Sequence, residues 1–155
     1  MHRQPRSPAG ESLTTLILDL FRVNNLILGW GDRLVAPLGL TSARWQVLGA
    51  VAAAERPQPV AWLARDLGSS RQNVQRIVND LAQAGLVGFA PNPHHKRAQL
   101  VVLTEAGAAT SAAALALYDP QANALAEGIA AEDLAAAQRV LSTLRARLDA
   151  EAAET

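Results

Sequence analysis

Two glycine-terminated helical segments with a short turn between them constrain the fold of this chain more than any other feature. The first begins at Pro59, a residue that suits the first turn of a helix, and ends at Gly68. The second follows the pair Ser69–Ser70, whose hydroxyls can cap a helix, and ends at Gly85. Two short helices joined by a glycine-containing turn have the spacing of a helix-turn-helix.

The apolar pattern changes its period after Gly85. Residues 86–90 and 99–103 are short apolar runs, and the second is rich in β-branched residues, so both are predicted to be strands. Residues 91–97 (PNPHHKR) lie between them as a turn-forming loop with a basic tip. A β-hairpin directly after a helix-turn-helix is a wing, so the centre of the chain is predicted to be a winged helix-turn-helix.

The segments before this region are predicted to be helical. In residues 12–35 the apolar side chains recur three and four apart, which indicates a long amphipathic helix that stops near Pro37 and Gly39. A second helix follows, and Thr41 or Ser42 supplies its N-cap oxygen. Its apolar stripe consists of Trp45, Leu48, Val51 and Ala52.

The segments after the wing are also predicted to be helical. Thr104 can cap a helix through an alanine-rich stretch, which we expect to be interrupted before Pro120. A last helix is expected from about Glu132. Its apolar positions alternate three and four residues apart, which suggests pairing with another helix. These positions are Leu134, Ala137, Leu141, Leu144 and Leu148.

Composition agrees with a mainly α fold that carries a small β-hairpin wing. Thirty-two of the 155 residues are alanine, the strongest helix former, and only 4% are aromatic. Because alanine buries little apolar surface, association between chains would supply missing burial. We expect a disordered lead-in at 1–11, an N-terminal dimerisation helix at 12–38, the winged helix-turn-helix at 39–104 and C-terminal dimerisation helices at 105–155, in one intertwined domain.

The net charge of zero conceals a partition along the chain. Residues 56–104 carry six basic and two acidic side chains, for a net charge of +4, whereas residues 105–155 carry three basic and eight acidic ones, for −5. A basic centre next to an acidic tail is typical of a protein with a local nucleic-acid-binding surface.

The second helix of the helix-turn-helix has a polar face suited to DNA. With Val74 at the centre of its inward face, Ile77, Val78 and Leu81 fall beside it, and Gln72, Arg76, Asn79 and Gln83 fall opposite. Arginine can bond guanine, and glutamine or asparagine can bond adenine, through two hydrogen bonds in the major groove. A helix N-terminus with serine hydroxyls suits phosphate oxygens. A merely solvated polar face is the alternative for any single helix.

From about Leu13 to Leu148 the sequence resembles the MarR family. The matching segments are LGLTSARWQVLGAVA, LARDLGSSRQNVQRIVNDLAQAGLV and NPHHKRAQLVVLTEAG, and the last two are the most specific. The resemblance implies a homodimer with intertwined first and last helices that binds double-stranded DNA at a palindromic operator and regulates transcription, as a repressor. It implies that the recognition-helix role falls on Ser70, Arg71, Gln72, Asn73, Gln75 and Arg76, and the wing-tip role on Lys96 or Arg97.

The wing departs from the family pattern. Many family wings read Asp-Arg-Arg, with the acid bracing an arginine, whereas this chain has His95-Lys96-Arg97. We expect Asn92 and Pro93 to hold the loop instead, and protonated histidines would add phosphate contacts at lower pH.

Many members of the family release DNA when a small anionic aromatic compound binds. An indole beside a guanidinium suits a planar anion, which makes Trp30, Arg33, Arg44 and Trp45 the candidate effector pocket. The competing interpretation, which we favour, is structural: Trp45 belongs to an apolar stripe and Trp30 fills a helix junction.

Other classes of function find little support. No metal site or cofactor is expected, because His94 and His95 point apart and neither a cysteine nor a nearby acid completes a ligand set. No catalytic constellation or phosphate loop occurs, so an enzyme is not expected. The N-terminal segment lacks the apolar core of a signal peptide, which favours a cytoplasmic protein without a membrane partner. The remaining alternative is a dimeric winged-helix interaction module without specific DNA binding.

Overall fold

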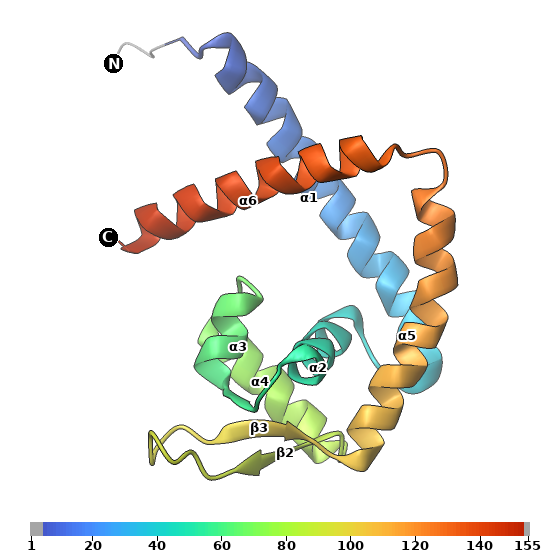
Figure 1. The fold of residues 1–155 in the computed structure, drawn as a ribbon, viewed down its shortest axis with the longest axis vertical. Helices are drawn as coiled ribbons and strands as arrows, with labels where there is room; N and C mark the ends of the chain where they lie inside the picture. The colour runs from blue at the N-terminus through green and yellow to red at the C-terminus, as the bar shows by residue number, and fades with distance from the viewer. Residues whose placement is uncertain (1–4, 154–155) are drawn as a thin grey trace. The chain divides into compact units, whose positions relative to one another are not determined.

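The structure, a computed structural model, describes residues 5–153. Its chain divides into two compact units, Met1–Tyr118 and Asp119–Thr155. The first contains α1 (Pro8–Val35), the 3₁₀ turn η1 (Ala36–Leu38), α2 (Ser42–Ala53), β1 (Gln58–Pro59), α3 (Val60–Asp66), α4 (Arg71–Gln83), β2 (Val87–Ala90) and β3 (Leu100–Leu103). Helix α5 (Glu105–Ala126) crosses the division, and α6 (Ala131–Ala153) belongs to the second unit (Figure 1). The predicted mainly helical fold with a small β wing is confirmed.

One apolar core holds the winged region together. The fully enclosed side chains include Leu48 of α2, Leu63 of α3, Leu81 of α4 and Val101 of β3. Helices α2, α3 and α4 therefore meet the sheet at a single centre, and this centre positions α4. Within the α2 stripe, Leu48 and Val51 are buried as predicted, but Ala52 is exposed and Val47 takes its place. Ala52 was misassigned because the stripe of a short helix is broad enough for either residue.

The sheet has three strands, in the order β1-β3-β2, all antiparallel. Strands β2 and β3 form the predicted wing, with Phe89 opposite Val101. The two-residue strand β1 pairs Gln58 with Val101 and was not predicted. Its partner lies more than forty residues away along the chain, and so short a segment has no periodicity of its own.

Helix ends follow the predicted capping chemistry with two corrections. Helix α1 begins at Pro8 rather than near Ser12, because the Ser7 hydroxyl accepts a hydrogen bond from the backbone N–H of Gly10 at 3.1 Å. Residues 8–11 are thus helical rather than disordered, and residues 1–4 of the predicted lead-in lie outside the described residues. Helix α5 continues through Pro120, where an interruption was expected. Pro120 has no N–H to donate to the carbonyl four residues earlier, whereas the alanines before and after it favour a continuous helix.

Contacts between α1 and α2 show that Thr41, and not Ser42, caps α2. Thr41 caps the helix by accepting a hydrogen bond from Arg44 N at 3.3 Å. The Ser42 hydroxyl instead donates to the Leu28 carbonyl at 2.7 Å, and its backbone N–H donates to Asp32 Oδ1 at 2.6 Å. Gly31 faces Ser42 so closely that a side chain there would overlap the Ser42 hydroxyl. The first helix is therefore fixed to the winged region through its last turns.

Thr104 and Gly107 lock the base of the wing to α5. The Thr104 hydroxyl donates to the Gly85 carbonyl at 2.6 Å and accepts from Gly107 N at 2.9 Å, so the predicted cap is confirmed. A Cβ at Gly107 would overlap the Leu86 carbonyl group. The threonine of the LTEAG segment therefore caps α5 and bonds to the end of α4. The glycine is needed because any side chain at position 107 would prevent α5 from starting this close to the Leu86 carbonyl.

No helix within residues 5–153 combines the length and the apolar character needed to cross a membrane.

Candidate nucleic-acid interface

Helix α4 presents a polar face outward and an apolar face inward. Val74, Ile77, Val78 and Leu81 are all buried, as predicted for the inward face. The side chains opposite them, at Gln72, Arg76, Asn79 and Gln83, are exposed. Because packing fixes the inward face, the rotation of α4 about its axis is fixed, and the outward set is held toward solvent.

The N-terminus of α4 is capped by the predicted serine. Ser70 Oγ accepts from Asn73 N at 3.1 Å, and the Asn73 side-chain amide donates to Ser69 Oγ at 3.1 Å. A hydroxyl that accepts one hydrogen bond keeps its own proton for a further acceptor. The free N–H groups of the first turn and the Ser70 hydroxyl therefore lie together, in an arrangement that suits a phosphate oxygen.

A groove of about 250 Å³ joins one side of α4 to the wing. We call it the wing groove. Arg71, Gln75 and Asn79 line it from α4, Phe89 and Arg97 line it from the hairpin, and residues 59–61 close it at the start of α3. Three residues of the predicted interface, Arg71, Gln75 and Arg97, thus share one concave surface. Gln75 Nε2 donates to Asn79 Oδ1 at 3.0 Å, which orients both amides.

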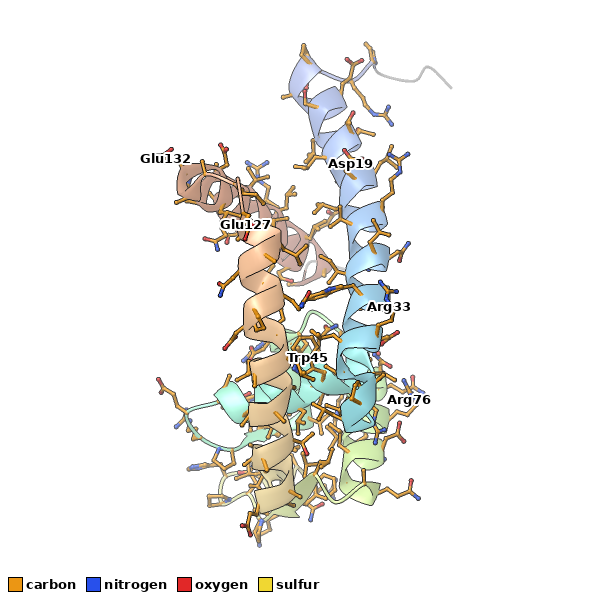
Figure 2. The ribbon with its side chains drawn as sticks, turned by 90° about the vertical axis from the view of Figure 1, so that its right-hand side faces the viewer. Asp19, Arg33, Trp45, Arg76, Glu127 and Glu132 are labelled. Atoms are coloured by element: carbon orange, nitrogen blue, oxygen red, sulfur yellow. The ribbon has the colours of Figure 1, made fainter. Side chains whose placement is uncertain are left out.

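The other side of the outward face carries three residues that we call the Arg76 cluster. Arg76 Nη1 lies 3.4 Å from Asp80 Oδ2, and Arg76 Nη2 donates to Asn73 Oδ1 at 3.2 Å. Both charged side chains remain solvent-accessible, and Figure 2 shows Arg76 at the edge of the molecule, away from Trp45. The α4 surface therefore has a wing side rich in amides and a far side with a paired arginine.

The wing loop is held by two hydrogen bonds to Asn92, one to its side chain and one to its backbone carbonyl. Asn92 Oδ1 accepts from His94 N at 3.0 Å, and the Asn92 carbonyl accepts from His95 N at 3.3 Å. The predicted role of Asn92 is confirmed by these contacts, which follow the geometry of an Asx turn. Lys96 and Arg97 are exposed at the end of the loop. They are available to a polyanion that approaches α4.

Seven residues that line the wing groove were absent from the predicted interface: Pro59, Val60, Ala61, Asn79, Phe89, Ala98 and Gln99. Asn79 was placed on the outward face but left out, since it lies beyond the first two turns of α4. Phe89 is 40% exposed and belongs to a strand whose inward and outward sides were not assigned. The alternation of Val87 and Phe89 with Gly88 and Ala90 did not by itself indicate which face of the strand is solvent-exposed.

The four candidate effector residues do not converge. Trp30 and Trp45 both contact the ring of Tyr118, edge to face, with centroid distances of 6.0 and 5.4 Å. Arg44 instead donates to the carbonyls of Gly39 and Asp80 at 3.2 and 3.3 Å. Figure 2 shows Arg33 at the outer edge of α1. The structure thus joins the tryptophans in an aromatic cluster with Tyr118, which sequence reasoning missed, and separates the arginines from them.

Within residues 5–153, no three histidine, cysteine or acidic side chains lie close enough together to hold a metal ion.

Comparison with known sequences places this geometry in a family. A MarR family profile matches residues 38–98. An uncharacterized protein of Mycobacterium tuberculosis is 40% identical over 97 residues, which are 63% of this chain and 66% of that protein. The transcriptional activatory protein BadR of Rhodopseudomonas palustris is 33% identical over 102 residues, 63% of this chain and 57% of BadR. The matched part of the chain thus spans less than two thirds of the length of these relatives.

Solved structures agree over nearly the whole chain. The repressor CouR bound to a 23-mer DNA duplex is 26% identical, with a TM-score of 0.73, and the match covers 90% of this chain and 99% of CouR. CouR from Rhodococcus jostii bound to p-coumaroyl-CoA is 24% identical over 81% of this chain and 88% of that one, with a TM-score of 0.74. This family consists of transcriptional regulators and not of enzymes. The chain belongs to the MarR family of winged helix-turn-helix transcriptional regulators.

Proposed function

We propose that this protein binds a palindromic operator in double-stranded DNA as a homodimer and represses transcription from it in the cytoplasm. The observation that carries the proposal is the wing groove, where Arg71 and Gln75 of the recognition helix meet Arg97 of the wing. Side chains that can read base edges lie beside cations that can neutralise phosphates, and DNA recognition requires both. The CouR–DNA complex, on the same fold, supports this assignment.

The homodimer is supported by apolar side chains that stay exposed on the long helices. Phe21 and Leu26 of α1 are 65% and 72% exposed, and Leu148 of α6 is 63% exposed. Several large apolar side chains left exposed on one helix mark an association site. A two-fold dimer would place its recognition helices in successive major grooves, so half-sites should lie about 10 base pairs apart.

The aromatic cluster of Trp30, Trp45 and Tyr118 is the candidate site for an effector that releases the DNA. Trp30, Trp45 and Tyr118 offer aromatic faces between α1, α2 and α5. The CouR structure with p-coumaroyl-CoA supports an aromatic acid derivative as the class of ligand. Because Arg33 and Arg44 point away from the ring cluster, the anionic group of such a ligand would need a different hydrogen-bond donor or cation.

The test is a gel-shift and footprinting titration with the intergenic DNA upstream of the protein's own gene, at several salt concentrations. We expect a protected palindrome, a complex of two chains, and an affinity that falls steeply as salt rises. Aromatic acids added to the complex should release the DNA, and a promoter-reporter fusion should show higher expression without the regulator. Lower expression would make the protein an activator, as BadR is named. Failure to bind at low salt would leave the interaction module as the better assignment.

A further inference from the structure

The recognition helix carries a carboxylate on a surface that is otherwise suited to a polyanion. Asp80 is the single acidic residue between positions 67 and 104 of the sequence. It lies on the far side of α4, one turn beyond Arg76, and its side chain is 45% exposed. A carboxylate near DNA repels phosphates, so Asp80 would weaken binding to DNA unless another contact offsets the repulsion.

The position of Asp80 is fixed from two directions. Its main-chain carbonyl accepts a hydrogen bond from Arg44 Nη2 of α2 at 3.3 Å, and the next residue, Leu81, is fully buried. Arg44 Nη1 also donates a hydrogen bond to the Gly39 carbonyl at 3.2 Å, which holds the Arg44 side chain in place. The carboxylate therefore projects from a backbone that the core and α2 hold in place.

The side chain of Asp80 acts on Arg76. The guanidinium lies between Asp80 Oδ2 at 3.4 Å and Asn73 Oδ1 at 3.2 Å, and all three residues belong to the same helix face. Arginine has five N–H donors in a planar fork, so two can reach the O6 and N7 acceptors of guanine while others keep Asn73 and Asp80. An exposed ion pair of this kind is weak enough to adjust when a base becomes available.

We propose that Asp80 is a specificity-determining residue that positions Arg76 and suppresses its contacts with DNA that lacks the operator sequence. On the operator, Arg76 gains a base contact that offsets the repulsion between Asp80 and nearby phosphates. On other sequences the guanidinium stays paired, its charge is partly neutralised, and the repulsion is not offset. This inference rests on the proposed DNA-binding function and adds how the protein separates its operator from other DNA.

The experiment compares wild type with Asp80→Asn on two probes, the protected operator fragment and a random-sequence duplex of the same length. We expect Asp80→Asn to bind the random duplex about tenfold more tightly and the operator at most about threefold more tightly, with a steeper salt dependence on the random duplex. The matched control is Asp66→Asn, because Asp66 is an exposed acid at the end of α3 that loses the same charge. It should change both affinities equally and slightly.

A double-mutant cycle with Arg76→Ala tests whether Asp80 acts through the arginine. The Asp80→Asn effect on the specificity ratio should largely disappear in the Arg76→Ala background, while circular dichroism shows all variants folded. An equal rise on both probes, the same result for Asp66→Asn, or an undiminished effect without Arg76 would each overturn the inference. If wild type binds neither probe, the proposed function itself fails, which is a separate outcome.

Discussion

The winged region and the long helices at either end of the chain differ in where their apolar side chains go. In the winged region, Leu48, Leu63 and Leu81 are enclosed, and the polar face of α4 is the part left outside. In α1 and α6 many large apolar residues, such as Phe21 and Leu148, are exposed. The first region has a complete core within one chain. The second leaves apolar surface uncovered, as expected of an element that pairs with a copy of itself.

The largest expected effect concerns this exposed surface. Phe21→Asp and Leu141→Asp, made singly, should each weaken dimerisation by about 3 kcal/mol or more, because a two-fold interface would bury two copies of an unpaired carboxylate. Sedimentation velocity over a range of protein concentrations measures the change. Ala146→Asp, which adds the same charge elsewhere on α6, is the control and should leave the dimer intact. A dimer that survives both apolar replacements would remove these helices from the interface.

The second effect concerns the closed core. Gly107→Ala should lower the free energy of unfolding by about 2–3 kcal/mol, since the new methyl group would overlap the Leu86 carbonyl and push α5 from the base of the wing. Urea denaturation followed by circular dichroism measures the loss. Gly49→Ala is the matched control, because a Cβ there meets nothing within 4 Å. The control should gain up to about 1 kcal/mol from helix propensity. Equal stability of the two variants would contradict the tight junction.

The smallest effect concerns the wing tip. Arg97→Ala should weaken binding to operator and random DNA alike and reduce the slope of log affinity against log salt by about one unit, because one phosphate contact is lost. Fluorescence anisotropy on the two duplexes at four salt concentrations gives both quantities. Arg139→Ala, on α6, removes the same charge from outside the wing groove and should change neither. An unchanged slope for Arg97→Ala would place the wing tip outside the interface.

The parts of this protein that could be predicted from sequence are those with a strong local signal. The inward face of α4, from Val74 to Leu81, follows from helical periodicity alone. The glycine stops at Gly68 and Gly85 are both in the left-handed conformation, which explains why a residue without a side chain stands there. The caps at Ser70 and Thr104 follow from the chemistry of hydroxyl groups beside free N–H groups.

The parts that escaped prediction depend on contacts between distant segments. Strand β1 exists because Gln58 meets Val101, and Tyr118 joins Trp45 only when α5 returns alongside α2. The Arg44 side chain was a candidate for an effector pocket, but tertiary packing brings the Asp80 carbonyl of α4 within its reach. The pairing of Arg76 with Asp80 was accessible from their spacing of four residues, yet only the structure showed that Asp80 contacts the outward-facing Arg76.

The sequence by itself determined that this chain forms a winged helix-turn-helix with a polar recognition helix and a basic wing, because capping, glycine stops and apolar periodicity act over a few residues. Tertiary structure decided which side chains of that helix face the wing groove and which stay with Asp80. It also decided that the tryptophans meet Tyr118 and not the arginines. These outcomes depend on how the helices pack around the buried leucines, and close packing is a property of the whole core that no local pattern contains.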